Sequence, residues 1–285
     1  MGGIGPSSLV HARTLTDATQ VLVKLNDSPQ RIVTLAPSLG ELAAELVGAD
    51  FDRIVGVSEY TDEPAGLKKV TSIGPYHQVN LEKVVSLKPD LVLATSDGNS
   101  KEQVLHLREL GVPVVVVRTE SFKDIEESIQ LVAEAIGSKA QGAKMVTQLK
   151  SGLQKFKERS KKHAPLKTIL QMGDQPLVVA GGKSFLSESL KLLGATNLYA
   201  ESDHHYPRPS LEDVLHRDPE AIVVLTFGKD LKPFRVMAQR WTQFPDLKAV
   251  KTKRVVILKS DALLRPTLRI LEGISQLERV LYGKT

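Results

Sequence analysis

"NLEKVVSLKPDLVLAT", residues 80–95, decides the fold, because its pattern recurs as "SLEDVLHRDPEAIVVLT" at residues 210–226. Both copies open with a helix-capping Asn or Ser, continue with Leu-Glu and an apolar pair, and reach an apolar run after Pro-Asp or Pro-Glu. This order predicts a short helix that ends at the proline and then a buried strand. The repeat therefore predicts two lobes built on the same plan.

The chain around the repeat alternates short apolar runs with segments of helical spacing. Helices are predicted between the apolar runs, and residues 14–25 predict a short β-hairpin in front of them. Buried strands that alternate with helices are typical of a parallel sheet covered on both faces, so the predicted fold class is α/β. Besides those of the repeat, strands are predicted at residues 31–36, 53–58, 112–117, 167–172, 176–181 and 254–259.

Three helix positions can be predicted in more detail. After the strand at residues 31–36, Ser38 is expected as an N-cap, with Glu41 completing a capping box. Pro233 is expected to interrupt a helix, and Pro266 to lie in the first turn of the last helix.

Two long helical segments, residues 121–137 and 139–163, separate the two copies of the repeat. The second reaches about 36 Å at 1.5 Å per residue, which is enough to join two lobes. The predicted organisation is an N-terminal tail with a short hairpin at residues 1–30, an N-terminal lobe at 31–138, a linking helix at 139–163 and a C-terminal lobe at 164–285.

The composition excludes several classes of protein. Hydrophobic residues make up 41% and charged residues 25% of the 285 residues, as in a globular protein that buries a core. The chain has no cysteine, which excludes disulfides, thiolate metal sites and cysteine nucleophiles.

Residues 1–12 lack the basic and apolar regions of an intact secretory signal, and "LVHA" before Arg13 fits the end of a removed one.

The net charge of +5 is unevenly distributed. Residues 1–137 contain 12 Lys/Arg and 19 Asp/Glu, whereas residues 138–285 contain 26 and 14. Many of the basic residues fall on the helical segment 139–162, where their spacing indicates a solvated face. No row of base-stacking aromatic residues interleaves with them, as single-stranded nucleic acid would require, because Phe156 belongs to the apolar residues of the helix. We therefore expect no binding of nucleic acid.

Motifs for the common catalytic chemistries are missing from the sequence. Gly181-Gly182-Lys183-Ser184 ends like a phosphate-binding loop, but Leu177 stands where the first glycine is required, so a strand-to-helix turn is expected. His204 and His205 are adjacent, and on a strand they would face opposite ways, which is a poor arrangement for zinc. We therefore expect no metal site. Because no set of nucleophile and base can be recognised either, we expect no catalytic residues and no enzymatic activity.

The motifs of the first half resemble those of a known family. "RIVTLAPS", "VGVSEYTDEP" and "NLEKVVSLKPDLV" follow one another as in the substrate-binding proteins of ABC importers for iron chelates, haem and cobalamin, and the cobalamin-binding type is the most similar. This resemblance implies two Rossmann-like lobes joined by one long helix, with a ligand cleft between them. It also implies a periplasmic monomer without a built-in cofactor, whose partners are the membrane subunits of an importer. The alternative left open is a scaffold of the same fold used as a sensor or an enzyme.

The resemblance also assigns residues to two tasks. The family's docking glutamates, which pair with arginines of the membrane subunits, fall on Glu82 and Glu212. Aromatic residues of the cobalamin-binding type fall on Tyr60, on Tyr76 and on Tyr206, the last two each six residues before a docking glutamate. The predicted ligand-binding residues are Tyr60, Tyr76, His77, Tyr206, Arg208, Leu263 and Arg265.

The ligand class follows from where the sequence departs from the cobalamin-binding pattern. Tyr76, Tyr206 and Thr95 stand where that type has tryptophans, and Ala262 to Leu264 stand where larger aromatics would hold a corrin ring. Carboxylate siderophores would prefer an arginine-lined cleft, for which Arg208, Arg265 and Arg269 are candidates. A corrinoid and a ferric siderophore are therefore expected equally, and haem third.

"ESDHHYPRPSLEDVL", residues 201–215, is predicted to be the cleft-lining loop of the second lobe. Tyr206 would offer a flat amphipathic face to a large ligand, and Arg208 a charge or hydrogen bonds. Pro207 and Pro209 stiffen the loop, which lowers the entropic cost of binding. Glu212 then begins the helix that is expected to meet the transporter.

Overall fold

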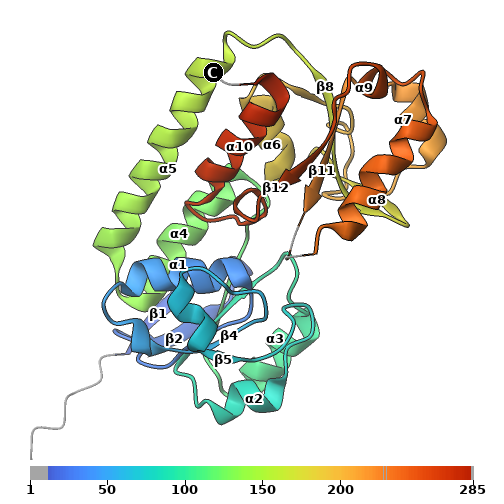
Figure 1. Cartoon of the computed structure of the whole chain (residues 1–285). Coiled ribbons are helices and arrows are strands. Elements are labelled where there is room, and N and C mark those ends of the chain that lie inside the picture. The colour runs from blue at the N-terminus through green and yellow to red at the C-terminus, as the bar shows by residue number, and fades with distance from the viewer. Residues whose placement is uncertain (1–11, 227, 229, 284–285) are drawn as a thin grey trace, which may run out of the picture. The chain divides into compact units, whose positions relative to one another are not determined.

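The computed structural model describes residues 12–226, 228 and 230–283 (Figure 1). The chain divides into two compact units. The N-terminal unit comprises Met1–Arg118 and Glu127–Lys144, and the C-terminal unit comprises Thr119–Glu126 and Met145–Thr285. Two helices, α4 (Phe122–Ile136) and α5 (Lys139–Ser160), therefore contribute residues to both units.

The N-terminal unit is built on a five-stranded parallel sheet in the order β5-β4-β3-β6-β7. In its centre Ile32 of β3 lies opposite Ile54 of β4 and Leu91 of β6, and every residue of β6 is buried. Continuous apolar runs explain this burial, since both faces of the sheet are covered. The strands are β3 (Ile32–Thr34), β4 (Ile54–Val57), β5 (Thr71–Ser72), β6 (Leu91–Thr95) and β7 (Val114–Val117).

Helices cover this sheet. Helix α1 (Pro37–Val47) contacts β3, β4 and β6. Helices α2 (Leu81–Ser86) and α3 (Lys101–Glu109) cover a core cluster that joins Val84 and Leu107 to Val92. Two short 3₁₀-helices, η1 (Phe51–Arg53) and η2 (Ala65–Lys69), lie in the connections.

The predicted capping box of α1 is wrong. Ala36 occupies the N-cap position without a side-chain hydrogen bond, and Pro37 takes the first turn. Because proline has no N–H to satisfy, it begins a helix readily. Ser38 consequently lies inside the helix, and Glu41 is buried on its inner face.

The predicted N-terminal hairpin is confirmed. Strands β1 (Ala12–Thr16) and β2 (Leu22–Asn26) pair antiparallel, and the turn between them begins at Asp17. The Ala18 N–H donates to the carbonyl of Val116 in β7 at 3.0 Å, which attaches the turn to the edge of the main sheet.

The C-terminal unit repeats the plan with a parallel sheet in the order β10-β8-β11-β12, to which β9 adds an antiparallel strand beside β8. The predicted α/β class with a parallel sheet in each half is thus confirmed. The strands are β8 (Lys167–Asp174), β9 (Leu177–Val179), β10 (Thr196–Asn197), β11 (Ala221–Thr226) and β12 (Val255–Lys259).

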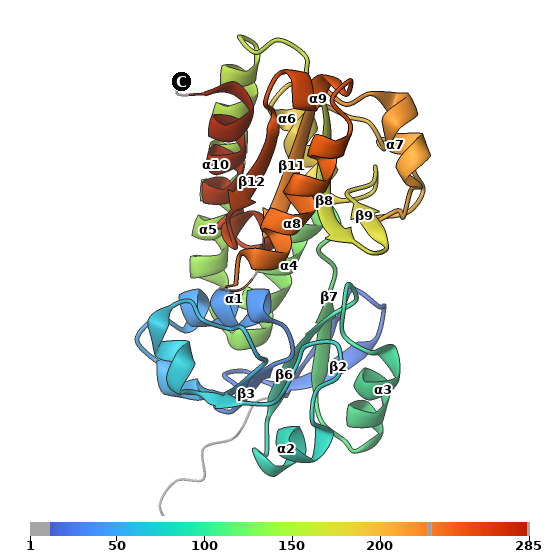
Figure 2. The same cartoon turned by 45° about the vertical axis from the view of Figure 1, so that its right-hand side comes forward.

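The helices of this unit cover its sheet, with α8 lying over β11 and β12 (Figure 2). Phe234 of α8 and Trp241 pack in the core, where the indole Nε1 donates to Gln171 Oε1 at 2.8 Å. The helices are α6 (Phe185–Leu192), α7 (Leu211–Arg217), α8 (Lys232–Arg240), α9 (Lys248–Lys251) and α10 (Ile270–Tyr282), with 3₁₀-helices η3 (Trp241–Gln243) and η4 (Ala262–Leu264).

Two proline predictions for this unit are wrong. Pro233 lies in the first turn of α8 and does not interrupt it. Pro266 precedes α10, which begins only at Ile270, because η4 forms first. The backbone of Leu263 in η4 approaches Gly273 so closely that a Cβ there would lie 2.3 Å from it, so η4 packs directly against α10.

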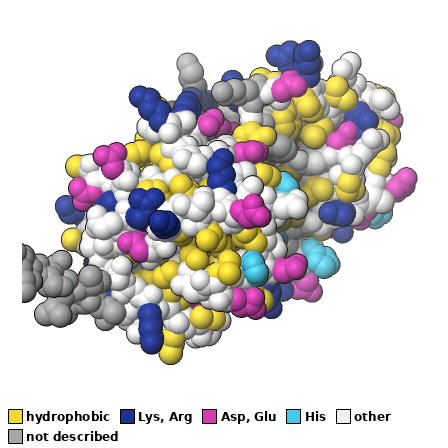
Figure 3. All heavy atoms as spheres, turned by 90° about the horizontal axis from the view of Figure 1, so that it is seen from below, with side chains coloured by type: hydrophobic (Ala, Val, Ile, Leu, Met, Phe, Trp, Pro, Cys, Tyr) yellow, Lys and Arg dark blue, Asp and Glu magenta, His cyan; other side chains and the backbone are white. Residues whose placement is uncertain are grey.

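Within the described part of the chain, no helix is long and apolar enough to cross a membrane. Seen from below, Lys and Arg side chains are scattered among acidic and apolar ones and form no continuous basic patch on the visible face (Figure 3).

Candidate functional site

The two copies of the repeat form equivalent helix starts. The Asn80 side chain accepts a hydrogen bond from the Lys83 N–H at 2.9 Å, and Ser210 accepts one from the Asp213 N–H at 3.2 Å. One turn in, Val84 and Val214 are fully buried, as the predicted apolar spacing requires. Both predicted helices are confirmed.

Each of these helices presents an exposed glutamate in its first turn, Glu82 in α2 and Glu212 in α7. Hydrogen bonds from its own backbone and from Ser210 lower the pKa of Glu212. A carboxylate is favoured at this end of a helix because the unpaired N–H groups there carry partial positive charge. Each unit therefore offers one exposed negative charge at a matching position.

Tyr60 stands in a strained turn of the N-terminal unit. Its backbone has φ of 63°, a conformation that is uncommon for a bulky residue and is most often kept at functional sites. The Thr61 hydroxyl donates to the Ser58 carbonyl at 2.7 Å, and Gly40 leaves room for Thr61, since a Cβ there would lie 2.4 Å from its methyl group. This packing fixes the turn and leaves the Tyr60 side chain exposed.

The turn of Tyr60 lies beside the loop of Tyr76. The Glu59 N–H donates to the carbonyl of Gly74 at 2.9 Å, so the two segments run side by side within the unit. The Tyr76 ring covers Gly98, where a Cβ would lie 2.6 Å from the ring, and meets His77 edge-on at 5.7 Å. The structure thus brings three predicted residues, Tyr60, Tyr76 and His77, to one region of the N-terminal unit.

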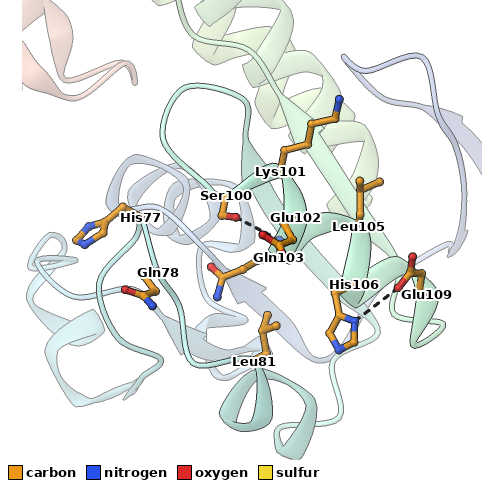
Figure 4. A pocket seen from close by; sticks show the side chains of 10 residues that line it. All are labelled: His77, Gln78, Leu81, Ser100, Lys101, Glu102, Gln103, Leu105, His106 and Glu109. Atoms are coloured by element: carbon orange, nitrogen blue, oxygen red, sulfur yellow. Dashed lines mark hydrogen bonds and ion pairs between the residues drawn. The ribbon is translucent and has the colours of Figure 1, made fainter.

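A depression of about 1030 Å³ lies next to this region, between the loop and α3 (Figure 4). His77 is the one predicted ligand-binding residue among its lining residues. Leu81 and the exposed Leu105 supply apolar surface, and on its edge His106 Nδ1 lies 3.6 Å from the Glu109 carboxylate.

In the C-terminal unit, Tyr206 and Arg208 line a depression of about 650 Å³. Its wall holds a polar cluster that sequence reasoning missed. The Tyr199 hydroxyl donates to Asp213 at 2.8 Å, Arg217 Nε donates to the same carboxylate at 2.9 Å, and the guanidinium lies 4.7 Å from the Tyr199 ring centroid. The i, i+4 spacing of Asp213 and Arg217 was the available signal.

The pKa values in this cluster shift in opposite directions. Hydrogen bonds from Arg217 and Tyr199 lower the pKa of Asp213. Burial and the hydrogen bond to Asp213 raise the pKa of Tyr199, so it stays a neutral donor. The cluster joins the start of α7 to Tyr199. It thereby also fixes the position of Glu212, the neighbour of Asp213 in α7.

The loop of Tyr206 rests on two glycines. The Gly181 N–H donates to the His205 carbonyl at 2.8 Å, and a Cβ on Gly182 would lie 1.8 Å from the Ala200 carbonyl oxygen. These glycines allow the backbone to approach this closely. The stretch that resembles a phosphate loop is thus the strand-to-helix turn that supports the Tyr206 loop, with Ser184 capping α6.

Leu263 does not fit its predicted role as a cleft wall. The side chain has no exposed surface and belongs to the core of the C-terminal unit, because η4 packs directly against α10. It can support the neighbouring loop but offers no surface to a ligand in this structure. Arg265, two residues on, is partly buried and lines neither depression.

No group of three or more His, Asp or Glu side chains is placed to hold a metal ion among residues 12–226, 228 and 230–283. His204 is exposed, and His205 Nε2 lies 3.3 Å from Glu120. The two histidines therefore have different surroundings.

Comparison with known proteins gives a consistent picture. The model of the family described as "Periplasmic binding protein" matches residues 32–262. The vitamin B12-binding protein of Vibrio cholerae is 29% identical over 248 residues, which covers 87% of each chain. YvrC, an ABC transporter substrate-binding lipoprotein of Bacillus subtilis, is 31% identical over 280 residues. The alignment covers 95% of this chain and 86% of YvrC.

A solved structure extends the likeness to the fold. The periplasmic vitamin B12-binding protein BtuF of Vibrio cholerae superposes with a TM-score of 0.77 at 28% identity, over 89% of this chain and 96% of BtuF.

Proposed function

Because the chain belongs to the periplasmic binding protein family, we propose that it captures a large metal chelate and delivers it to an ABC importer. The observation that carries this proposal is the repeated pair of side chains. In each unit an exposed tyrosine, Tyr76 or Tyr206, precedes an exposed first-turn glutamate, Glu82 or Glu212, by six residues. The tyrosine of each pair suits a flat ligand, and the glutamate suits a basic partner protein.

We further propose that residues 31–138 and 164–285 act as two lobes, that residues 139–163 link them, and that the ligand binds in a cleft between the lobes. Aromatic faces would give affinity, and a few polar groups selectivity. The proposed ligand-binding residues are Tyr60, Tyr76, His77, Tyr206, Arg208 and Arg265.

The proposed ligand is a corrinoid or a ferric siderophore, with haem third. Relatives named as vitamin B12-binding proteins support the corrinoid. The exposed Arg208 beside Tyr206 supports a ligand that carries carboxylates, because guanidinium binds carboxylate in a two-point geometry. The chelate is cargo and not a cofactor, and the protein makes or breaks no bond in it.

The proposed partners are the membrane subunits of the importer. Glu82 and Glu212 would form a two-point electrostatic clamp with basic residues there. We also propose that the protein works in the periplasm as a monomer and does not bind nucleic acid.

Thermal unfolding tests the proposed ligand class. Cyanocobalamin, haemin and ferrichrome would each be added separately. A chelate at a hundredfold excess over its Kd stabilises the folded protein by about 2.7 kcal/mol. That corresponds to a rise in Tm of roughly 5 °C or more for a chain of this size. The proposal requires at least one such rise, and no rise with any chelate would remove its support.

A further inference from the structure

One segment of the N-terminal unit joins the proposed ligand-facing side chain to the proposed transporter-facing one. Tyr76 and Glu82 lie at its two ends. Between them, the Asn80 N–H donates to the Ile73 carbonyl at 2.8 Å, and the Asn80 side chain caps α2 through the Lys83 N–H. The position of Asn80 therefore decides where Glu82 points.

Gln103 of α3 holds the middle of this segment through both ends of its amide. Its Nε2 donates to the Val79 carbonyl at 2.8 Å, and its Oε1 accepts from the Val79 N–H at 3.1 Å. The side chain thus pairs with Val79 as a neighbouring strand would. In Figure 4 the Gln103 side chain extends from α3 toward the loop that carries His77 and Gln78.

Asn99, which lies just before the N-cap of α3, holds the Tyr76 end. Its Nδ2 donates to the Tyr76 carbonyl at 2.6 Å and to the Leu35 carbonyl at 2.8 Å. Its Oδ1 accepts from the Thr95 N–H at 2.8 Å. The amide thereby connects the Tyr76 loop to the ends of β3 and β6.

We propose that Asn99 and Gln103 are positioning residues that fix Tyr76 and Glu82 relative to one another. The inference rests on the proposed function for the tasks of Tyr76 and Glu82. Surface loops are mobile unless their backbone groups are bonded, and a loop held in its bound conformation loses less entropy on binding. Five side-chain hydrogen bonds from two residues supply this restraint.

Amide hydrogen exchange, followed residue by residue by NMR in the ligand-free full chain, tests the restraint. Gln103→Met keeps the length of the side chain and removes both bonds to Val79. The expected result is exchange at least about tenfold faster at Val79 and also at Asn80 and Lys83, which Gln103 does not touch. Faster exchange at Val79 alone would overturn the proposal, because the restraint would then be local.

Ser100→Ala is the matched control, since Ser100 lies between the two residues and its hydroxyl accepts from the Gln103 N–H at 3.3 Å. This variant weakens the start of α3 but leaves the bonds to the segment. Exchange at Asn80 and Lys83 should stay within twofold of the parent protein. An equal acceleration in Ser100→Ala and Gln103→Met would also overturn the proposal.

Titration with cyanocobalamin adds a functional readout. Asn99→Asp keeps the acceptor for Thr95 but loses both donors, and it should weaken binding about tenfold, as should Gln103→Met, whereas Ser100→Ala should not. Equal affinity of all variants would contradict the positioning role. If the parent protein does not bind cyanocobalamin, the proposed corrinoid is wrong, and the exchange measurement still decides whether the restraint exists.

Discussion

Arg159 near the end of α5 and Glu278 in α10 form a two-point ion pair, with guanidinium nitrogens 2.5 and 3.2 Å from the carboxylate oxygens. Glu278 is 2% exposed, and the side chain of Arg159 is 43% exposed. His163 extends the contact: its Nε2 lies 3.7 Å from Glu278 and its ring stacks on Tyr282 at 4.0 Å. This cluster fastens the end of α5 to α10 within the C-terminal unit.

Arg159→Ala should lower the free energy of unfolding by about 2 kcal/mol, because it leaves the buried Glu278 without its two-point partner. The value is below that of a fully buried pair because water reaches the arginine. Urea unfolding followed by the fluorescence of Trp241, the single tryptophan, reports on this unit. Lys155→Ala, an exposed change in the same helix, should cost less than about 0.5 kcal/mol. Equal losses in the two variants would contradict the role of the pair.

Asp17 anchors the N-terminal hairpin. It is 2% exposed, accepts the N–H groups of Thr19, Val21 and Val116 at 2.8, 3.2 and 3.0 Å, and forms an ion pair with Arg108. Burial raises the pKa of Asp17, but the hydrogen bonds from Thr19, Val116 and Val21 together lower it below its ordinary value.

Asp17→Asn should therefore destabilise the protein by about 2 kcal/mol at pH 7. A depressed pKa contributes stability above the unfolded pKa, about 3.9, and this contribution is lost as the pH falls through the lower folded value. The difference between parent and variant should be largest near neutral pH and shrink below about pH 4. Urea unfolding at several pH values, followed by circular dichroism, measures it. A difference that grows toward low pH would contradict the assignment, and the exposed Asp27→Asn serves as the control.

Gly182→Ala should destabilise the C-terminal unit by about 3 kcal/mol and displace the Tyr206 loop, because the new Cβ would lie 1.8 Å from a backbone oxygen that cannot give way. Gly111→Ala is the comparison, because nothing lies within 4 Å of its Cβ and only its φ of 76° opposes the change. That variant should cost about 1 kcal/mol. Thermal unfolding distinguishes the two, and equal costs would show that the loop is not seated on Gly182.

The helix starts of the site could be predicted because the repeat encodes them locally. A cap, a first-turn acid and buried Val84 or Val214 determine each start, and the structure has them where the pattern indicates. The buried strands could be predicted for the same reason, since their apolar runs suit only a covered sheet.

Features that depend on distant partners could not be predicted. The sequence predicts Leu263 in an exposed loop, but the side chain is buried because Gly273 lets the backbone of Leu263 approach α10. The hydrogen bonds between Gln103 and Val79 join residues 24 positions apart in the sequence, and no local sequence pattern predicts them. The prediction of Ser38 as the N-cap of α1 failed for a local reason, because the neighbouring Pro37 takes the first turn and Ala36 the N-cap position.

Tyr206→Ala should weaken binding of the captured chelate about tenfold, because the ring supplies a flat face of apolar area. Tyr206→Phe keeps that face and should bind within about threefold of the parent protein. Equilibrium titration with the chelate that raises the Tm measures both variants. A loss in Tyr206→Phe as large as in Tyr206→Ala would assign the role to the hydroxyl and contradict the stacking interpretation.

Reversal of both docking charges, Glu82→Lys with Glu212→Lys, should abolish binding to the importer's membrane subunits and leave chelate affinity unchanged. Co-purification with detergent-solubilised importer measures docking. Asp52→Lys with Asp246→Lys is the matched control, since it changes the charge equally at one exposed position in each unit. Equal docking by the Glu82/Glu212 variant and the parent protein would contradict the clamp.

The most direct test of chelate capture is gel filtration of the protein after separate mixing with cyanocobalamin, haemin and ferrichrome. Absorbance is recorded at the visible absorption maximum of each chelate. The expected result is that one chelate elutes with the protein and that a Tyr60, Tyr76 and Tyr206 triple alanine variant loses the colour. Colourless protein peaks with all three chelates, or colour retained by the triple variant, would contradict capture at these tyrosines.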